Sequence, residues 1–215
     1  MADAGSSRKW PGLFIVLEGG DGGGKSTQAQ LLRRRFEEAG REVILTREPG
    51  GTALGEQLRE IILHPPSARA HPPAVELFLF LAARTQLVAE VIRPALAAGK
   101  VVVCDRFNDS TIAYQGYGRG LDVDAVRAVG VLAMSDVRPD LSVLLDLPVD
   151  VGLARNSHEE WDSIGHESRE FHERVRAGFH ALAYEAPERW LAVDATLPVD
   201  DIADAIWERV RRLAQ

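Results

Sequence analysis

Five short apolar runs recur along the chain, and each is followed directly by a charged residue. Runs of this length without regular polar alternation are typical of strands buried on both faces of a sheet. They are rich in valine, isoleucine and leucine, and the β-branched members of that set favour strands. The runs predict strands at residues 13–17, 42–46, 101–104, 141–145 and 190–193.

Between these runs, apolar residues recur at the three- and four-residue spacing of amphipathic helices. The first helix shows this spacing at Ala29, Leu32 and Phe36, and Gly40 suits its C-terminal cap. Further helices are expected at about residues 54–64, 121–134, 149–155, 171–182 and 202–213.

The longest helical pattern covers residues 75–98 and is apolar on every side between residues 77 and 83. A helix without a polar face is typical of a central, buried position. Pro94 lies inside this pattern and has no backbone N–H to donate. We therefore expect a central helix that is kinked or interrupted at Pro94.

Strands that alternate with helices predict an α/β fold, in which a five-stranded, mainly parallel sheet is covered by helices on both faces. Ligands of such sheets bind beyond the carboxyl ends of the strands. Residues 156–168 are polar and show no clear period, which predicts a mobile lid. We expect a flexible tail at residues 1–12 and a single domain at residues 13–215, because no repeat or linker divides the chain.

Composition argues against several classes of function. The chain has 215 residues, of which 46% are hydrophobic, and its formal charge of −7 argues against a general nucleic-acid-binding surface. No apolar run approaches the roughly 20 residues of a membrane-spanning helix, and residues 1–11 lack the apolar core of a signal peptide. Cys104 is the only cysteine, which excludes an intrachain disulfide and suits a reducing compartment, and its apolar strand context predicts a buried thiol. We expect a soluble, cytoplasmic protein that binds neither nucleic acid nor membranes.

Residues 19–26 match G-x-x-x-x-G-K-[ST], the pattern of a phosphate-binding loop, between the first strand and the first helix. Glycines let backbone N–H groups turn toward phosphate oxygens, and the start of a helix favours an anion. Lys25 adds a positive charge for the β- and γ-phosphates, and the Ser26 hydroxyl is placed to ligate Mg²⁺. The residues expected to bind the nucleoside triphosphate are Gly19, Gly20, Gly22, Gly23, Gly24, Lys25, Ser26 and Thr27.

Charged residues at the ends of the second and third strands indicate a second phosphorylated ligand. Asp105 occupies the position where phosphate-loop proteins keep a carboxylate for Mg²⁺. Arg106 can hold a phosphate through two parallel hydrogen bonds, whereas the alternative is a surface ion pair with its neighbour. Arg47 is either a further phosphate ligand or an exposed loop arginine. Two arginines and Lys25 at one edge favour phosphoryl transfer between nucleotides over simple hydrolysis.

Longer runs spread from residue 14 to about residue 207 resemble the bacterial type of the thymidylate kinase family. The matching stretches are residues 14–27, 46–52, 80–84, 105–116 and 193–196. Among them, R-E-P-G-G-T and D-R-F-x-x-S-x-x-A-Y-Q are far more specific than the phosphate loop. The resemblance implies a P-loop nucleoside monophosphate kinase with a three-layer sandwich and a lid. Such an enzyme phosphorylates dTMP to dTDP in dTTP biosynthesis, uses ATP and Mg²⁺, and is usually a homodimer.

The resemblance also implies a role for each matching position. Arg47 and Arg106 would hold the dTMP phosphate, and Asp21 would accept a hydrogen bond from the 3′-hydroxyl of the deoxyribose. Phe80 would stack on thymine and Arg84 would donate to its O4 atom; the alternative for this pair is a core phenylalanine beside a snorkelling arginine. The remaining implied roles are a base site lined by Ser110, Thr111 and Gln115, a Tyr114 ring that crowds the 2′ position, an adenine site near Asp194 and Thr196, and a cis peptide bond before Pro49.

The chain departs from the family pattern at the position of one arginine. The family usually supplies an arginine to the transferring phosphate from the phosphate loop or from the lid, and these positions here hold Gly22 and Ser163. Such arginines raise the rate of phosphoryl transfer by about 10³–10⁵-fold. Arg155 or Arg169 could substitute, although both are also compatible with solvated helix residues. The expected catalytic residues are Lys25, Asp105, Arg106 and Arg155, and the expected metal ligands are Ser26 and Asp105.

Two alternatives remain open at this point. A relative that acts on another, modified pyrimidine monophosphate would share most of these residues, because one methyl group changes binding by only about 1–3 kcal/mol. A nucleotide-binding protein with weak catalysis would account for the missing lid arginine.

Overall fold

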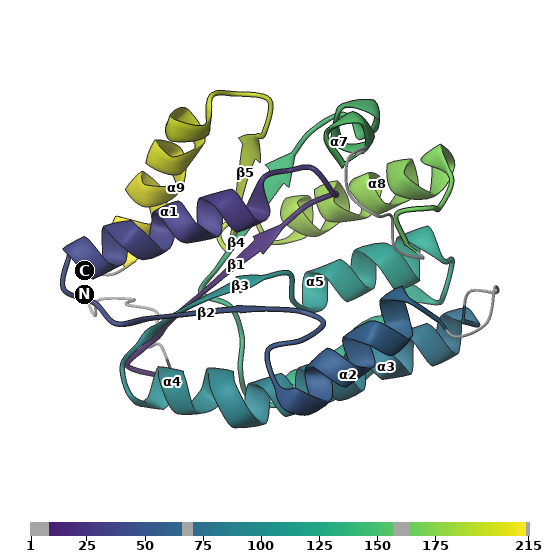
Figure 1. Cartoon of the computed structure of the whole chain (residues 1–215), viewed down its shortest axis with the longest axis horizontal. Helices are drawn as coiled ribbons and strands as arrows, with labels where there is room; N and C mark the ends of the chain where they lie inside the picture. The colour runs from purple at the N-terminus through teal and green to yellow at the C-terminus, as the bar shows by residue number, and fades with distance from the viewer. Residues whose placement is uncertain (1–8, 66–70, 157–163, 214–215) are drawn as a thin grey trace, which may run out of the picture.

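The computed structural model describes residues 9–65, 71–156 and 164–213, and a five-stranded sheet forms its centre (Figure 1). All four strand pairings are parallel, and the strand order is β2-β3-β1-β4-β5. The strands are β1 (Leu13–Glu18), β2 (Val43–Arg47), β3 (Val101–Asp105), β4 (Leu141–Asp146) and β5 (Trp190–Asp194). The predicted fold class is therefore confirmed, and each strand runs one residue further than its apolar run, to end on the charged residue.

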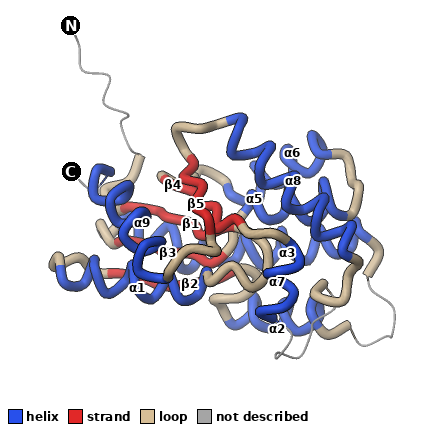
Figure 2. Tube along the Cα trace, turned by 90° about the horizontal axis from the view of Figure 1, so that it is seen from above, coloured by secondary structure: helices blue, strands red, loops and turns tan. Residues whose placement is uncertain are grey.

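Helices cover both faces of the sheet. They are α1 (Lys25–Glu38), α2 (Ala53–Leu63), α3 (Pro73–Leu87), α4 (Arg93–Ala97), α5 (Asn108–Thr111), α6 (Val123–Met134), α7 (Val149–Asn156), α8 (Arg169–Glu185) and α9 (Val199–Leu213), with two π-helical turns, η1 (Val88–Ile92) and η2 (Ile112–Gly118). Seen from above, α1 and α9 lie to one side of the strands, and α5, α6 and α8 lie to the other (Figure 2).

Alternate residues of the strands pack into different cores, as the pleat of a strand requires. Leu13, Ile15 and Leu17 pack with the apolar stripes of α1 and α9. Phe14 and Val16 face the opposite way, into a core shared with α3, η1 and α4. Both faces of β1 are buried, which explains why its sequence is apolar throughout.

The predicted long helix is interrupted, as expected, but the break begins before Pro94. The α-helical hydrogen bonds of α3 end at Leu87, and the π turn η1 separates α3 from α4. Pro94 then lies in the first turn of α4, directly after the π turn. The predicted burial holds for one face of the helix only, since Leu77, Leu81 and Leu87 are buried whereas Phe78 is 62% exposed.

The apolar pattern predicts no helix over residues 108–118, but α5 and η2 form there. Asn108, Asp109, Ser110 and Thr111 are all buried, so this helix hides polar side chains instead of an apolar stripe. Turns of π-helix are frequent at functional sites. The exception to the apolar pattern therefore falls on one of the segments that resembles the family.

Three further expectations concern the periphery and the thiol. Cys104 is buried, as its apolar surroundings predicted. No helix among the described ranges is long and apolar enough to cross a membrane. The predicted tail and lid fall largely on residues 1–8 and 157–163, outside the described residues, so both stay predictions.

Candidate active site

The charged residues that end the central strands meet at one edge of the sheet. The parallel register pairs Arg47 with Asp105 and Leu17 with Asp105, so the carboxyl ends of β2, β3 and β1 lie side by side. The phosphate loop leaves this edge directly after Glu18 and leads into α1. The predicted triphosphate ligands therefore lie where open α/β sheets bind their ligands.

Lys25 closes the phosphate loop and folds back over it. Its Nζ atom donates to the carbonyl oxygen of Gly20 at 2.8 Å and lies 3.4 Å from that of Gly19. Burial, together with the neighbouring Arg106, lowers the pKa of Lys25, while Asp105 opposes the shift. The ammonium group is thus held at the start of α1, beside the backbone N–H groups that a phosphate would use.

Ser26 and Asp105 form the predicted metal pair. The Ser26 hydroxyl donates to Asp105 Oδ2 at 3.0 Å, which brings one hydroxyl oxygen and one carboxylate together next to the loop. Among the described residues there is no cluster of three or more His, Cys, Asp or Glu side chains that could hold a metal ion. Two oxygen ligands nevertheless suit Mg²⁺, because this ion is commonly bound by one or two carboxylates together with substrate phosphates.

Arg106 is held in a strained backbone conformation by several hydrogen bonds. Its φ of 68° lies in the left-handed region that favours glycine. The guanidinium donates to Gly19 O at 2.9 Å and to Asp21 Oδ1 at 2.5 Å, and it lies 4.9 Å from the centre of the Tyr114 ring. Burial alone would lower the pKa of Arg106, but Tyr114 and Asp21 raise it, so the guanidinium keeps its charge.

A cavity of about 120 Å³ lies beside Arg106 and the phosphate loop. Nine of the ten predicted substrate residues line it: Asp21, Pro49, Phe80, Arg84, Arg106, Ser110, Thr111, Tyr114 and Gln115. The peptide bond before Pro49 is cis, as predicted. Residues from the loops after β1, β2 and β3 and from α3, α5 and η2 therefore converge on one small space.

Arg84 is not a snorkelling side chain, because only 1% of it is exposed. Its Nε and Nη2 atoms donate to Glu48 Oε2 at 2.8 and 2.5 Å, and Nη2 and Nη1 also donate to Thr111 and Asn108. These four bonds leave one of the five guanidinium N–H groups, on Nη1, for a ligand. Burial raises the pKa of Glu48, and Arg84 partly offsets this effect. The alternative of a core phenylalanine beside a solvated arginine is therefore wrong for Arg84.

Arg47 lies apart from the other predicted substrate residues. Its Nη2 atom donates to Glu56 Oε2 at 2.9 Å, and the side chain is about half exposed. It lines a separate, open cleft of about 350 Å³, which it shares with Ser26 and Asp105. The structure thus places Arg47 on the side of the loop that carries Ser26 and Asp105, and its predicted contact with the dTMP phosphate stays a prediction.

The two candidate replacement arginines lie in different surroundings. Arg155 donates from Nη1 to the carbonyl oxygens of Gly22 at 3.2 Å and Ala195 at 3.0 Å, so it bridges the phosphate loop and the turn after β5. Arg169 pairs with Asp150 at 2.7 Å, and its side chain is 57% exposed. This geometry favours Arg155. Ser163 and its neighbours in the expected lid lie outside the described residues.

Asp194 and Thr196 form a turn at the end of β5. Asp194 Oδ1 accepts hydrogen bonds from the Thr196 backbone N–H at 2.8 Å and from its hydroxyl at 2.6 Å. Both residues line an open hollow of about 350 Å³, together with Asp146 and Arg176. The predicted adenine residues are therefore adjacent to each other and, through Ala195 and Arg155, to the phosphate loop.

Sequence reasoning missed two buried carboxylates of this site. Glu18 is fully buried, and its oxygens accept hydrogen bonds from Phe107 N at 3.0 Å and from Ser110 Oγ at 2.5 Å. Burial, reinforced by Asp109, raises the pKa of Glu18 to about 8. The second carboxylate is Glu48. A signal existed for both, because an ionisable residue inside a buried strand or beside a buried arginine needs specific partners.

Comparison with known proteins gives one consistent result. The family model described as thymidylate kinase matches residues 17–206. The thymidylate kinase of Thermomicrobium roseum is 50% identical over 199 residues, which cover 92% of this chain and 93% of the relative. The thymidylate kinase of Pseudomonas fluorescens Pf0-1 is also 50% identical, over 91% of this chain and 93% of the relative. The crystal structure of thymidylate kinase from Ehrlichia chaffeensis superposes with a TM-score of 0.76 at 34% identity and covers 93% of this chain and 98% of that one.

Proposed function

The chain belongs to the thymidylate kinase family, and we propose that the cavity beside the phosphate loop is where it binds dTMP. The enzyme transfers the γ-phosphoryl group of ATP to dTMP, which yields dTDP and ADP. One observation supports the site above all others: nine predicted substrate residues, drawn from three loops and three helical segments, line one cavity beside Lys25 and the phosphate loop.

The donor nucleotide would occupy the phosphate loop and the turn after β5. The loop N–H groups and Lys25 would hold the β- and γ-phosphates, and Asp194 and Thr196 would lie near the adenine. Ser26 and Asp105 would hold Mg²⁺, which neutralises charge on the β- and γ-phosphate oxygens when bound. The bridge that Arg155 makes between Gly22 and Ala195 supports a contact with ATP.

The acceptor nucleotide would occupy the cavity. Its phosphate would lie near Arg106, and the Asp21 carboxylate would accept a hydrogen bond from the 3′-hydroxyl. Phe80 would stack on the thymine ring, and the remaining N–H of Arg84 would donate to the O4 atom. The bonds from Arg84 to Glu48 support this role, because they fix the direction of that N–H.

Alignment and fixed charge account for most of the catalysis. Phosphoryl transfer passes through a loose transition state whose charge is spread over the transferring oxygens, and it needs no covalent link to the protein. Lys25, Arg106 and Arg155 would stabilise that charge, and Arg106 would also orient the acceptor. Arg155 would do so in place of the arginine missing at positions 22 and 163.

Exposed apolar side chains bear on the oligomeric state, and the buried thiol bears on the location. Phe78 on α3 and Leu132 on α6 are apolar and are 62% and 81% exposed, respectively. Val75 and Val131 are further exposed apolar residues on the same two helices. Because α3 and α6 contact each other, these side chains can form one face, and we propose a homodimer through it. We propose a cytoplasmic location, which suits an ATP-dependent enzyme with a reduced, buried thiol. Light scattering of Leu132→Asp tests the dimer, since loss of dimer mass is expected.

A coupled ADP-release assay tests the function. With equal concentrations of dTMP, dUMP, UMP and dCMP, we expect dTMP to have the highest kcat/KM. Negligible ADP formation with dTMP would contradict the function, and a faster rate with another nucleotide would redirect it.

A matched pair of variants on one helix tests the site. Phe80→Leu removes the aromatic face from the cavity, and we expect KM for dTMP to rise by about tenfold, as loss of stacking requires. Phe78→Leu changes an exposed phenylalanine two residues away and should leave this KM unchanged. Equal effects of the two variants would contradict the proposed site.

A further inference from the structure

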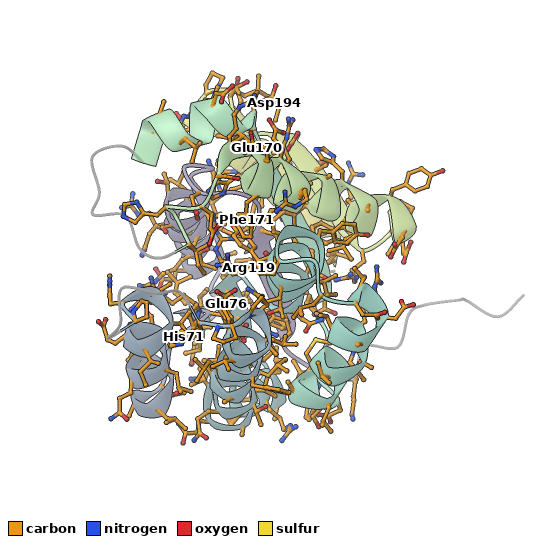
Figure 3. All side chains as sticks on the ribbon, turned by 90° about the vertical axis from the view of Figure 1, so that its right-hand side faces the viewer. His71, Glu76, Arg119, Glu170, Phe171 and Asp194 are labelled. Atoms are coloured by element: carbon orange, nitrogen blue, oxygen red, sulfur yellow. The ribbon has the colours of Figure 1, made fainter. Side chains whose placement is uncertain are left out.

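Arg119 joins elements that are distant in the sequence and that border the cavity. It follows η2 directly, and its guanidinium contacts Glu76 on α3 and Glu167 just before α8. In Figure 3 Arg119 lies between Glu76 below and Phe171 above. None of these four residues belongs to the site assigned above.

The contacts of Arg119 are close and largely shielded from water. Nε and Nη2 donate to the two oxygens of Glu76 at 3.1 and 2.9 Å, and Nη1 donates to Glu167 Oε1. The guanidinium carbon lies 4.9 Å from the centre of the Phe171 ring. The side chains of Arg119 and Glu76 are only 12% and 4% exposed. Burial would lower the pKa of Arg119, but the bonds to Glu76 and Glu167 raise it, so the charge is kept.

Glu76 connects Arg119 to the wall of the cavity. Its Oε1 atom, which accepts from Arg119, also accepts from Gln115 Nε2 at 2.8 Å. Gln115 lines the cavity and is 1% exposed. With its amide nitrogen bonded to a carboxylate, Gln115 chiefly offers its carbonyl oxygen to a ligand. A carbonyl oxygen accepts from the N3–H of thymine, whereas the N3 of cytosine has no hydrogen to donate.

Glu167 connects Arg119 to a second part of the cavity wall. The backbone N–H of Glu167 donates to Ile164 O at 3.1 Å, which closes a turn immediately before α8. Ile164 is buried and lines the same cavity as Gln115. Arg119 therefore links the polar and the apolar walls through one carboxylate each.

We propose that Arg119 is a positioning residue for the base pocket, which acts through Glu76 on the Gln115 amide and through Glu167 on the turn of Ile164. The proposal rests on the proposed dTMP site. A buried ion pair is weak support for stability, because desolvation offsets most of its attraction. The planar guanidinium of Arg119 instead fixes the direction of the carboxylates that it contacts. Arg119 thus increases the preference for thymine without contacting the base.

The test compares Arg119→Met and Glu76→Gln with wild type in the ADP-release assay, with dTMP and dCMP as acceptors. Loss of one well-aligned hydrogen bond to the base should raise KM for dTMP by about tenfold and lower the dTMP-to-dCMP preference by a similar factor. KM for ATP should stay within about twofold of wild type, because no contact to the phosphate loop is changed. Arg119→Lys keeps the charge but loses the fork, so an intermediate effect is expected.

Arg127→Met is the matched control, because Arg127 pairs with Glu185 between α6 and α8 at the surface. It should leave the KM for dTMP and the preference unchanged. If Arg119→Met does not fold, Glu167→Gln replaces it, since Glu167 is partly exposed. That variant should raise KM for dTMP by about threefold.

The outcomes separate the two proposals. If wild type phosphorylates dTMP and the folded variants keep both its KM and the preference, Arg119 serves only stability and the inference is overturned. If wild type does not phosphorylate dTMP, the proposed function fails first and the inference fails with it.

Discussion

Gly22 of the phosphate loop and Gly152 of α7 cross with their backbones in direct contact. A Cβ atom built on Gly22 would overlap the carbonyl oxygen of Gly152, and one built on Gly152 would lie 2.5 Å from the carbonyl oxygen of Asp21. Gly22 also has a φ of 72°, which disfavours any side chain. An arginine at position 22 is therefore excluded by this packing, and the charge has to come from another element.

The crossing predicts that a single methyl group is harmful at either position. We expect Gly22→Ala to lower the free energy of unfolding by about 1–3 kcal/mol. The alanine would be strained at this positive φ, and its methyl group would have to displace α7. Urea denaturation monitored by tryptophan fluorescence measures the change. Gly20→Ala is the control, since a Cβ at Gly20 has no atom within 4 Å. A Gly22→Ala protein as stable as the control would contradict the description of the crossing.

Arg155 lies one helical turn beyond Gly152 and bonds to Gly22 O, so it is the expected replacement for the missing arginine. Arg155→Ala should reduce kcat by about 10³-fold, the lower end of what an arginine contributes to phosphoryl transfer. The same substitution at Arg169, which pairs with Asp150 at the surface, should leave kcat nearly unchanged. Rapid-quench measurement of a single turnover isolates this step from product release.

A second arginine provides the complementary test. Adding Ser163→Arg to Arg155→Ala should restore part of the lost rate. Equal rates for Arg155→Ala and wild type would rule out Arg155 as the source of the charge.

Glu18 should make stability depend on pH. Its pKa is raised from an ordinary value of 4.5 to about 8, so between these values the folded chain binds more protons than the unfolded chain. The contribution of Glu18 is therefore fully present below pH 4.5 and is lost as the pH rises to about 8. Thermal unfolding at several pH values should show a steeper fall of Tm for wild type than for Glu18→Gln. Parallel profiles for the two proteins would show that Glu18 titrates normally.

The fold was predictable because its signals are local. Buried parallel strands read as apolar runs, so all five were found, with each end short by the charged residue and the start of β2 one residue early. The α5–η2 segment was missed because its inward face is polar: Ser110 bonds to Glu18, and Thr111 bonds to Arg84. A periodicity that separates apolar from polar residues cannot detect a helix whose buried side is polar.

The site was predictable mainly through resemblance to a family. Residue types and spacing identified the phosphate loop with Lys25 and Ser26, but they left Phe80 and Arg84 indistinguishable from core residues. Glu48, the main partner that orients Arg84, lies 36 residues away in the sequence and meets it only in the folded chain. The crossing of Gly22 and Gly152 is a tertiary contact in the same sense, and no local pattern encodes it.

The most direct test of the central claim is the turnover of Lys25→Ala with dTMP and ATP. We expect kcat to fall by about 10²–10³-fold, as loss of a fixed charge at the transferring group requires. The circular dichroism spectrum and Tm should stay close to wild type. Lys100→Ala, which removes a surface lysine paired with Glu42, should keep normal turnover. Near-normal turnover of a folded Lys25→Ala protein would contradict the assignment of this loop as the catalytic site.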